Sequence, residues 1–372
     1  MKIIVIGTRG IPNIQGGVET HCEELYPRLV AMGCDVTIVR RSCYVSADNK
    51  TTLYKGVKLK DIYAPKLKSL EAITHTFLAV FYAWREKADI LHIHAIGNTL
   101  MAPVARALGL RVIMTHHGPD YDRQKWGRLA KLALKAGEYM GAKYANSIIV
   151  ISEVIDKILR TKYNRTDAIL IFNGVNIPVK STGTEYIHSL GLEANKYLLT
   201  VGRFVEEKGF DILINVFSRL PISQDMKLAI AGDALHETEY TRRLVELAKS
   251  KGIVLPGFIK GEKLNEIYTH ARLFVLPSFH EGLPICLLEA MSYGLEALVS
   301  DIPAHLAVRL PESDYYKTGD NQALAEGLMR KLSFEKHDVS YYLEPYNWDK
   351  IAKLTLSVYQ KEYEKCQKLK KV

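Results

Sequence analysis

Residues 278–294 read SFHEGLPICLLEAMSYG and contain two glutamates, Glu281 and Glu289, separated by seven residues. The apolar run LFVLP at 273–277 predicts a buried parallel strand, and the leucines after Pro284 predict a helix that ends at the following glycine. Glu281 then lies in the loop between strand and helix, and Glu289 lies inside the helix. In an open α/β sheet, ligands bind where strand carboxyl ends meet helix N-termini. A loop carboxylate there can accept hydrogen bonds from sugar hydroxyls, and one inside the helix can reach a ribose diol.

The composition limits the class of protein. The chain has 372 residues and a hydrophobic fraction of 48%, which is enough for two domains with cores. Its five cysteines form no CxxC pair, which favours a reducing compartment and argues against a zinc site. The start MKIIVIG is too short for a signal peptide, and no run reaches the roughly 20 apolar residues of a membrane span, so a cytoplasmic protein is expected. The net charge of +9 suits nucleic acid, anionic lipid or phosphorylated substrates without choosing among them.

Strand-like and helix-like runs alternate along the chain, which predicts parallel sheets with helices on both faces. The polar stretch 41–55 is expected to be loop, and the irregular stretch 176–195 to be a linker. A long charged helix is expected at 349–368. The expected strands are 2–6, 35–41, 89–94, 111–115, 147–151, 168–172, 197–201, 227–231, 253–255, 273–277 and 296–300.

Two loops carry residue types that suit a phosphate. Gly16 and Gly17 stand just before the first predicted helix, where backbone N–H groups can face an anion, although a turn that needs positive φ would explain them as well. The spacing of the glycines excludes the G-x-G-x-x-G dinucleotide fingerprint. Arg203 and Lys208 follow the strand at 197–201 and can clamp a diphosphate, or they can be two solvated loop cations.

Taken in order, these segments resemble glycosyltransferase family 4, a family of retaining enzymes with the GT-B fold and an E-x7-E signature. The loop GGVET at 16–20 is similar to a bacterial rhamnosyltransferase-like subgroup of that family, which acts in cell-surface polysaccharide synthesis. The resemblance implies two Rossmann-like α/β domains that face a cleft. An acceptor-side domain would cover residues 1–178 and a donor-binding domain residues 179–345. A C-terminal helix at 346–372 would cross back to the first domain.

The resemblance also implies roles for particular residues. Glu281 would face the donor sugar, Glu289 the ribose, and Arg203 with Lys208 the pyrophosphate and its leaving charge. His117 would contact the donor sugar, with His116 as the alternative. The catalytic set is thus His117, Glu281, Arg203 and Lys208, and the donor-binding set adds Gly16, Gly17, Phe258 and Ile259 beside the base, Gly282, Leu283, Pro284 and Glu289. No cofactor and no metal are expected, because Arg and Lys usually neutralise the diphosphate in this fold.

Other polar groups are interpreted less specifically. His92 and His94 stand two residues apart on one predicted strand and share a face, so we interpret them as structural. Asp120 and Asp122 could hold Mg²⁺, but an acceptor-side or structural role is favoured.

The predicted function is retaining transfer of a hexose or deoxyhexose from a nucleotide-diphosphate sugar to a carbohydrate acceptor that is lipid-linked. Both dTDP-rhamnose and UDP-sugars are compatible with the sequence as donors. The rivals are a GT-B nucleotide-sugar epimerase, which needs no acceptor, and a basic nucleic-acid-binding α/β protein. Nucleic-acid binding calls for basic residues interleaved with aromatic ones on one face. The 125–143 helix alone offers that pattern, so nucleic acid is not expected as a partner.

Residues 122–143, DRQKWGRLAKLALKAGEYMGAK, predict a basic amphipathic helix with Trp126 as an interfacial aromatic residue. That composition is typical of a helix that lies on an anionic membrane surface. An ordinary packing helix, whose apolar stripe faces its own sheet, is the alternative. On the first interpretation the protein is peripheral on the inner face of the cell membrane.

Overall fold

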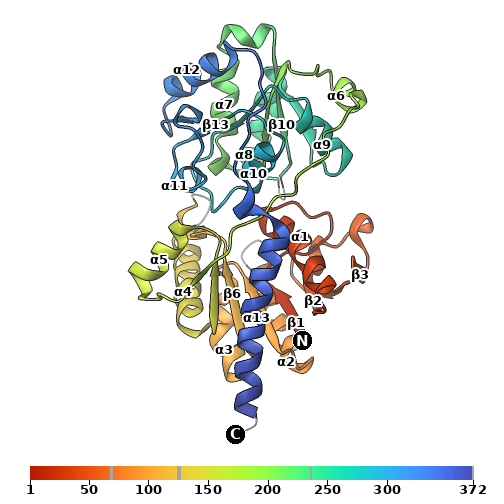
Figure 1. Ribbon diagram of the computed structural model, residues 1–372, viewed down its shortest axis with the longest axis vertical. Coiled ribbons are helices and arrows are strands. Elements are labelled where there is room, and N and C mark those ends of the chain that lie inside the picture. Colours follow the sequence, from red (N-terminus) through yellow and green to blue (C-terminus); the bar gives the residue numbers. More distant parts are fainter. Residues whose placement is uncertain (68–69, 124–126, 235–236, 371–372) are drawn as a thin grey trace. The chain divides into compact units, whose positions relative to one another are not determined.

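The computed structural model describes residues 1–67, 70–123, 127–234 and 237–370. The chain divides into two compact units, which are treated separately below (Figure 1). Unit 1 comprises Met1–Gly174 together with Tyr346–Val372, and unit 2 comprises Val175–Pro345. Lys125 and Trp126, which belong to the predicted basic amphipathic helix, lie outside the described residues.

Unit 1 is built on an eight-stranded sheet of order β3-β4-β2-β1-β5-β6-β7-β8. All neighbouring strands pair in parallel except β3 with β4. The central strands are fully buried and rich in isoleucine and valine, as expected of a sheet covered on both faces. The strands are β1 (Lys2–Ile6), β2 (Asp35–Arg41), β3 (Leu53–Tyr54), β4 (Val57–Ile62), β5 (Ile90–His94), β6 (Val112–His116), β7 (Ser147–Val150) and β8 (Ile169–Leu170).

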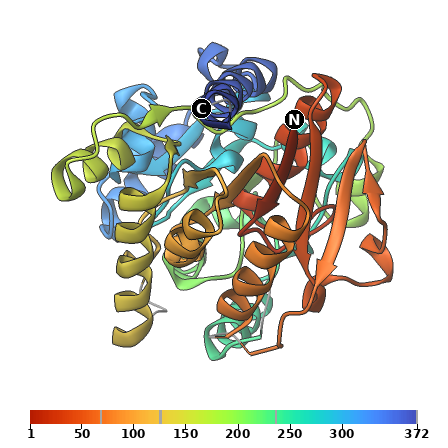
Figure 2. The same ribbon diagram turned by 90° about the horizontal axis from the view of Figure 1, so that it is seen from below.

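The helices of unit 1 cover both faces of this sheet. Helix α13 belongs to unit 1 and packs against α1, which confirms that the C-terminal helix crosses back to the first domain. Figure 2 shows α13 (dark blue) on one face of the sheet, with α2 (orange) and α4 (olive) on the opposite face. The helices are α1 (Gly17–Ala31), α2 (Glu71–Arg85), α3 (Ala102–Ala107), α4 (Arg128–Tyr144), α5 (Glu153–Tyr163) and α13 (Trp348–Lys370).

Unit 2 is built on a six-stranded, all-parallel sheet of order β11-β10-β9-β12-β13-β14. Its strands are β9 (Tyr197–Val201), β10 (Lys227–Ala231), β11 (Val254–Gly257), β12 (Leu273–Leu276), β13 (Ala297–Ser300) and β14 (Tyr315–Tyr316). Its helices are α6 (Glu185–Ser189), α7 (Phe210–Phe217), α8 (Glu239–Ser250), α9 (Glu262–Thr269), α10 (Ile285–Ser292), α11 (Pro303–Leu306) and α12 (Asn321–Leu332).

The structure corrects two sequence predictions. The stretch predicted as loop at 41–55 contains β3 and two 3-10 turns, and β4 follows it directly. Strand β4 was not predicted, although VKLKDI alternates and buries Val57 and Leu59 on one face. The stretch predicted as an irregular linker at 176–195 contains α6, which buries Ile187. The backbone N–H of Ile187 donates a hydrogen bond to Glu266 Oε1 over 2.8 Å.

The order of strands places the polar loops of each unit. In unit 1 the chain runs outward from β1 through β2 and then restarts at β5 on the other side of β1. In unit 2 it runs outward from β9 through β10 and restarts at β12. Ligands of open α/β sheets bind at such points, beside the carboxyl ends of the two diverging strands. The loops after β9 and β12 carry Arg203, Lys208 and Glu281 of the predicted donor site.

Candidate active site

The predicted residues of unit 2 meet where the loops after β9 and β12 run side by side. Lys208 Nζ donates a hydrogen bond to Glu281 Oε1 over 2.5 Å, and Ser278 Oγ donates to the same oxygen over 2.8 Å. The two charged side chains are only 12% and 13% exposed. Lys208 and Glu281, predicted from separate motifs, therefore form one buried ion pair.

Both members of this pair are held in their charged forms. Burial opposes the charge on Lys208, but the attraction of Glu281 prevails and the pKa of the ammonium is raised. Burial likewise opposes the charge on Glu281, yet Lys208 and the hydrogen bond from Ser278 lower the pKa of its carboxyl. The site thus presents a permanent cation next to a permanent carboxylate.

A glycine brings the two loops together. Gly209 adopts φ +64°, and a Cβ atom there would lie 2.6 Å from the carbonyl oxygen of Pro277. The backbone N–H of Phe279 donates to the carbonyl of Glu207 over 2.8 Å, which joins the same two loops. A side chain at position 209 would push the loops apart, so glycine is needed for the Lys208–Glu281 contact.

Glu289 lies in the middle of α10, half-buried. The hydroxyl of Tyr268 donates to Glu289 Oε2 over 3.1 Å and also to the carbonyl of Cys286 over 3.2 Å. Burial and the carboxylate hold the pKa of Tyr268 well above its usual value, so this hydroxyl stays a donor. Tyr293 stacks on Tyr268 with 5.1 Å between ring centroids and fixes its plane.

The remaining predicted donor residues of unit 2 follow the carboxyl ends of its strands. Arg203 follows β9 and is half-buried. Phe258, 39% exposed, and Ile259 follow β11. Gly282, Leu283 and Pro284 connect Glu281 to α10, and Pro284 is the N-cap of that helix.

His305 is a neighbour of the ion pair that the sequence did not indicate. It is fully buried, and its Nδ1–H donates to the carbonyl of Ser300 over 2.8 Å, which leaves a lone pair on Nε2. Among the described residues, Nε2 has no hydrogen-bond partner. Burial lowers the pKa of His305 to about 4, against the opposing attraction of Glu281.

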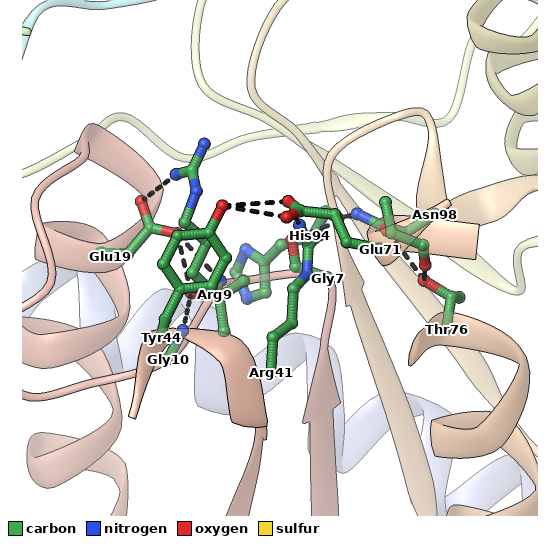
Figure 3. Close-up of polar contacts among 12 residues, drawn as sticks. Gly7, Arg9, Gly10, Glu19, Arg41, Tyr44, Glu71, Thr76, His94 and Asn98 are labelled. Carbon is green, nitrogen blue, oxygen red and sulfur yellow. Dashed lines mark hydrogen bonds and ion pairs between the residues drawn. The ribbon is translucent and has the colours of Figure 1, made fainter. Parts of the chain in front are cut away.

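In unit 1, the loop after β1 is folded around Glu19 (Figure 3). The Glu19 carboxylate, in the first turn of α1, accepts hydrogen bonds from Thr8 Oγ1, the Arg9 backbone N–H and Arg9 Nη1. Gly16 is the N-cap of α1, and a Cβ atom there would lie 2.0 Å from Glu19 Oε2, whereas one on Gly17 would meet nothing within 4 Å. Packing on Glu19 therefore accounts for Gly16 without a phosphate, and a phosphate at these glycines stays a prediction.

A second charge pair lies beside this loop in Figure 3. Arg41 Nη1 donates to Glu71 Oε1 over 2.8 Å, and the hydroxyl of Tyr44 donates to both oxygens of Glu71 over 3.1 Å. The Arg9 guanidinium lies 5.6 Å from the centroid of the Tyr44 ring. Two arginines and two glutamates thus balance one another and tie the carboxyl ends of β1 and β2 to the start of α2.

The structure separates the two candidate histidines after β6. His116 is fully buried and uses both ring nitrogens, since Nε2 lies 2.9 Å from Glu138 Oε1 and Nδ1 accepts from the backbone N–H of Gly118. His117 is partly exposed, and its Nε2 lies 2.8 Å from Nδ1 of His94. Among the described residues, His117 Nδ1 has no hydrogen-bond partner, so His117 is the one with a nitrogen available to a ligand.

His117 is the end of a buried hydrogen-bonded chain. Tyr26 Oη lies 2.6 Å from His94 Nε2 and 3.0 Å from His92 Nδ1. His92 Nδ1 also lies 2.5 Å from Tyr359 Oη of α13, and its Nε2 lies 2.7 Å from Thr115 Oγ1. His92 and His94, interpreted as structural, therefore connect α13 to His117. Burial lowers the pKa of His117 well below its usual value, with the neighbouring histidines adding to the effect.

The aspartates proposed as an alternative metal site lie in a 3-10 turn after β6. Asp120 Oδ1 pairs with Arg123 Nη2 at 3.0 Å. Within the described ranges, no three His, Cys, Asp or Glu side chains gather closely enough to hold a metal ion.

Each half of the chain matches a known protein family model. Residues 15–178 match the family model described as Glycosyltransferase Family 4, and residues 184–341 match Glycosyl transferases group 1. An uncharacterized glycosyltransferase of Methanocaldococcus jannaschii is 26% identical over 97% of this chain and 98% of its own length. The UDP-Gal:alpha-D-GlcNAc-diphosphoundecaprenol alpha-1,3-galactosyltransferase of Escherichia coli is 29% identical over 59% of each chain.

Solved structures of glycosyltransferases superpose on nearly the whole chain. Sucrose-phosphate synthase of Thermosynechococcus elongatus superposes with a TM-score of 0.78, at 20% identity, over 98% of this chain and 99% of that one. Anabaena HepE in complex with UDP and glucose gives 0.78 at 15% identity over 97% and 100%. The fold is therefore GT-B, and the protein is a glycosyltransferase of that type. The chain belongs to the GT-B glycosyltransferases, with a family 4 domain in its first half and a group 1 domain in its second.

Proposed function

We propose that this glycosyltransferase moves a hexose or deoxyhexose from a nucleotide-diphosphate sugar to a sugar hydroxyl, with retention of anomeric configuration. The observation that carries the proposal is the Lys208–Glu281 ion pair, formed where two loops meet at the carboxyl edge of the unit 2 sheet. Glu289, inside α10 of the same motif, supplies a second carboxylate for the nucleotide ribose. Bound UDP and UDP-glucose in structures of Anabaena HepE support a nucleotide-sugar donor.

In this proposal the protein contributes chiefly electrostatic stabilisation of the leaving diphosphate. Lys208 keeps its proton because of Glu281 and offers a fixed ammonium to the phosphate oxygens. Arg203, on the same loop, offers a planar fork that can bind two of them. Glu281 accepts hydrogen bonds from hydroxyls of the donor sugar, and His117 contacts that sugar through Nδ1. The departing diphosphate itself assists removal of the acceptor proton on the same face of the sugar.

We propose a lipid-linked acceptor in bacterial surface polysaccharide synthesis. The E. coli relative named above acts on a diphosphoundecaprenol-linked sugar, and the relatives also include a serotype-specific mannosyltransferase of that organism. Such an acceptor would require the enzyme to work at a membrane surface. None of the helices in the described part of the chain has the length and apolarity needed to cross a bilayer. In this proposal the attachment is peripheral, at the cytoplasmic face.

Helix α4 was the predicted point of attachment, and its first turns have the required surface. Leu129 is 85% exposed and Leu132 66%, with Arg128 and Lys135 exposed beside them. The buried side of α4 is formed by Gly137, Glu138, Gly141 and Ala142 in its second half. These leucines therefore do not pack on the sheet, which supports the interfacial interpretation of this segment.

A donor screen tests the proposal. The wild type and Lys208→Met are incubated with UDP-, GDP- and dTDP-sugars, with and without undecaprenol-diphosphate-linked sugars. Nucleoside diphosphate release is measured, and NMR reports the anomeric configuration of the product. Acceptor-dependent release from one donor, retention in the product and its loss in Lys208→Met are expected. Interconversion of the nucleotide-sugar without release would identify an epimerase instead.

A further inference from the structure

Helix α2 has a buried side and an exposed side, and the exposed side is apolar. Its inner side places His75, Thr76, Ala79, Val80 and Ala83 in the unit 1 core. Large apolar side chains follow one another on the outer side at intervals of three or four residues. They are Leu70, which caps the helix, Ile73, Phe77, Phe81 and Trp84, and they are between 37% and 51% exposed. A surface helix normally turns polar residues outward, so α2 has the opposite of the expected pattern.

These side chains form a continuous surface. The rings of Phe77 and Phe81 lie 4.9 Å apart between centroids, at an interplanar angle of 53°. Leu78 is also 38% exposed on the same helix, and Leu67, which precedes it, is 59% exposed. Contiguous exposed apolar surface of this kind is unusual on a soluble protein and marks a contact site. We call residues 70, 73, 77, 81 and 84 the outer face of α2.

The charges around the outer face are basic. Lys60, Lys66, Arg85 and Lys87 are all exposed; Arg85 is the last residue of α2, and Lys87 follows shortly after it. The neighbouring acids are occupied: Asp61 Oδ1 accepts from Arg40 Nε over 2.6 Å, and Glu86 Oε2 accepts from Lys2 Nζ over 2.6 Å. These cations form a basic rim around the outer face, which attracts anions. An aromatic residue beside a cation, such as Trp84 beside Arg85, is typical of the headgroup level of a bilayer.

We propose that the outer face of α2 inserts into the interface of an anionic lipid bilayer. A second copy of the chain fits less well, since a two-fold contact brings each patch onto itself and would set the basic rim against a basic rim. A bilayer offers apolar depth for the phenylalanines and negative headgroups for the rim together. The proposal rests on the membrane association proposed above, and it assigns the attachment to α2.

Helix α4 can contact the same bilayer. Both helices lie on the face of the sheet opposite to α13 (Figure 2), and α3 packs against both of them. The two surfaces differ in kind, because α4 presents two exposed leucines among cations whereas α2 presents a continuous aromatic stripe with cations at its ends. Substitutions in one helix can therefore be compared with substitutions in the other.

Vesicle co-sedimentation tests the proposal on the full chain. Vesicles of phosphatidylglycerol and phosphatidylcholine are compared with phosphatidylcholine alone at low salt. Phe77→Ser/Phe81→Ser should weaken partitioning at least tenfold, and Lys66→Glu/Lys87→Glu should weaken it about fivefold for each cation removed. Phe334→Ser, at an exposed phenylalanine of unit 2, is the matched control and should bind like wild type. Unchanged thermal unfolding shows that each variant is folded.

Tryptophan quenching then locates the contact. Lipids brominated on the acyl chain quench indoles that enter the interface, and the chain has three tryptophans, of which Trp348 is buried. Quenching should persist in Trp126→Phe and be lost in Trp84→Phe. The reverse result, or a binding loss confined to Lys131→Glu/Lys135→Glu, would assign attachment to α4 and overturn the proposal.

Two other outcomes would also overturn it. If wild type does not bind anionic vesicles, the membrane placement fails, while nucleoside diphosphate release in vesicle-free solution still decides the transferase function independently. If light scattering shows a dimer that Phe77→Ser/Phe81→Ser converts to a monomer, the outer face of α2 is a contact between copies of this chain.

Discussion

His94 Nδ1 lies 2.8 Å from His117 Nε2, and this contact links the protonation of the two rings. Burial keeps both imidazoles neutral, because it lowers the pKa of each well below its usual value. If the Tyr26 hydroxyl donates to His94 Nε2, then His94 Nδ1 carries the proton and donates to His117 Nε2. The proton of His117 then resides on Nδ1, which becomes a hydrogen-bond donor for a ligand.

Tyr26→Phe should therefore disturb His117 without touching it. We expect nucleoside diphosphate release to fall about tenfold, as for the loss of one buried hydrogen bond. The ¹⁵N shifts of the His117 ring should change from one tautomer to a mixture. Tyr359→Phe removes the hydroxyl that contacts His92, which is more distant from His117 in the hydrogen-bonded chain. It should have a smaller effect on both nucleoside diphosphate release and the ¹⁵N shifts. Equal ¹⁵N shifts in Tyr26→Phe and wild type would show that the chain does not set the tautomer.

Substitutions of Glu281 and Glu289 should impair the enzyme in different ways. Glu289→Ala should weaken binding of the nucleoside diphosphate by roughly 1.5–3 kcal/mol, the value of a hydrogen bond to a charged group. Glu281→Gln should leave binding largely intact and reduce turnover, because its carboxylate is assigned to the sugar. Calorimetric titration and release assays separate these effects.

Glu281→Gln should also lower the free energy of unfolding by about 3 kcal/mol, because it leaves Lys208 buried without its counter-charge. Tyr268→Phe keeps the Glu289 carboxylate and serves as the control for indirect damage to α10. Nucleotide affinity and turnover at wild-type levels in both glutamate variants would show that the site has been assigned to the wrong residues.

The fold was predictable because most strands are short apolar runs that alternate with helix-like segments. The bounds predicted for β2, β9 and β10 agree with the structure residue for residue. Strand β4 was missed because its alternating lysines occur in a polar region, and its partner β2 lies earlier in the chain. Helix α6 was missed because its five residues have little periodicity of their own and depend on a hydrogen bond to Glu266, 79 residues away.

The site was predictable residue by residue but not contact by contact. Motifs pointed to Lys208 and Glu281 separately, and their pairing depends on β9 and β12 being neighbours, which brings together residues 73 positions apart. The same holds for His94 and His117, which are joined by the pairing of β5 with β6. His305 lies in the short helix α11 after β13, and no local sequence pattern distinguishes it.

Arg203→Ala and Lys208→Ala should each lower the rate tenfold or more, because each removes a cation that is proposed to stabilise the leaving diphosphate. Chelators should have no effect on the wild type. Release is measured with and without EDTA, and with Mg²⁺ added back. Activity that EDTA abolishes and Mg²⁺ restores would return Asp120 and Asp122 to the site as metal ligands.

Unit 1 should lose stability in mild acid because of its buried neutral histidines. Burial lowers the pKa of His21 to about 4 and that of His92 to about 3, from 6.5 in the unfolded chain. Below pH 6.5 these histidines therefore take up protons in the unfolded chain but stay neutral in the folded one. The free energy of unfolding consequently falls as the pH falls from 6.5 toward 4. At pH 5 each ring contributes a loss on the order of 2 kcal/mol, from about 1.4 kcal/mol per unit of pKa.

The measurement is the melting temperature between pH 7 and pH 5. Two such rings should lower it by roughly 10 °C, since about 1 kcal/mol moves a unit of this size by 2–4 °C. His92→Gln removes one titrating ring, so it should lower the melting temperature at pH 7 through its lost hydrogen bonds and yet flatten the dependence on pH. His337→Gln, at a ring that is 66% exposed, should leave the slope as in wild type. If the melting temperature depends on pH equally in His92→Gln and wild type, then His92 takes up its proton without unfolding. The buried hydrogen-bonded chain that ends at His117 would then tolerate a charge.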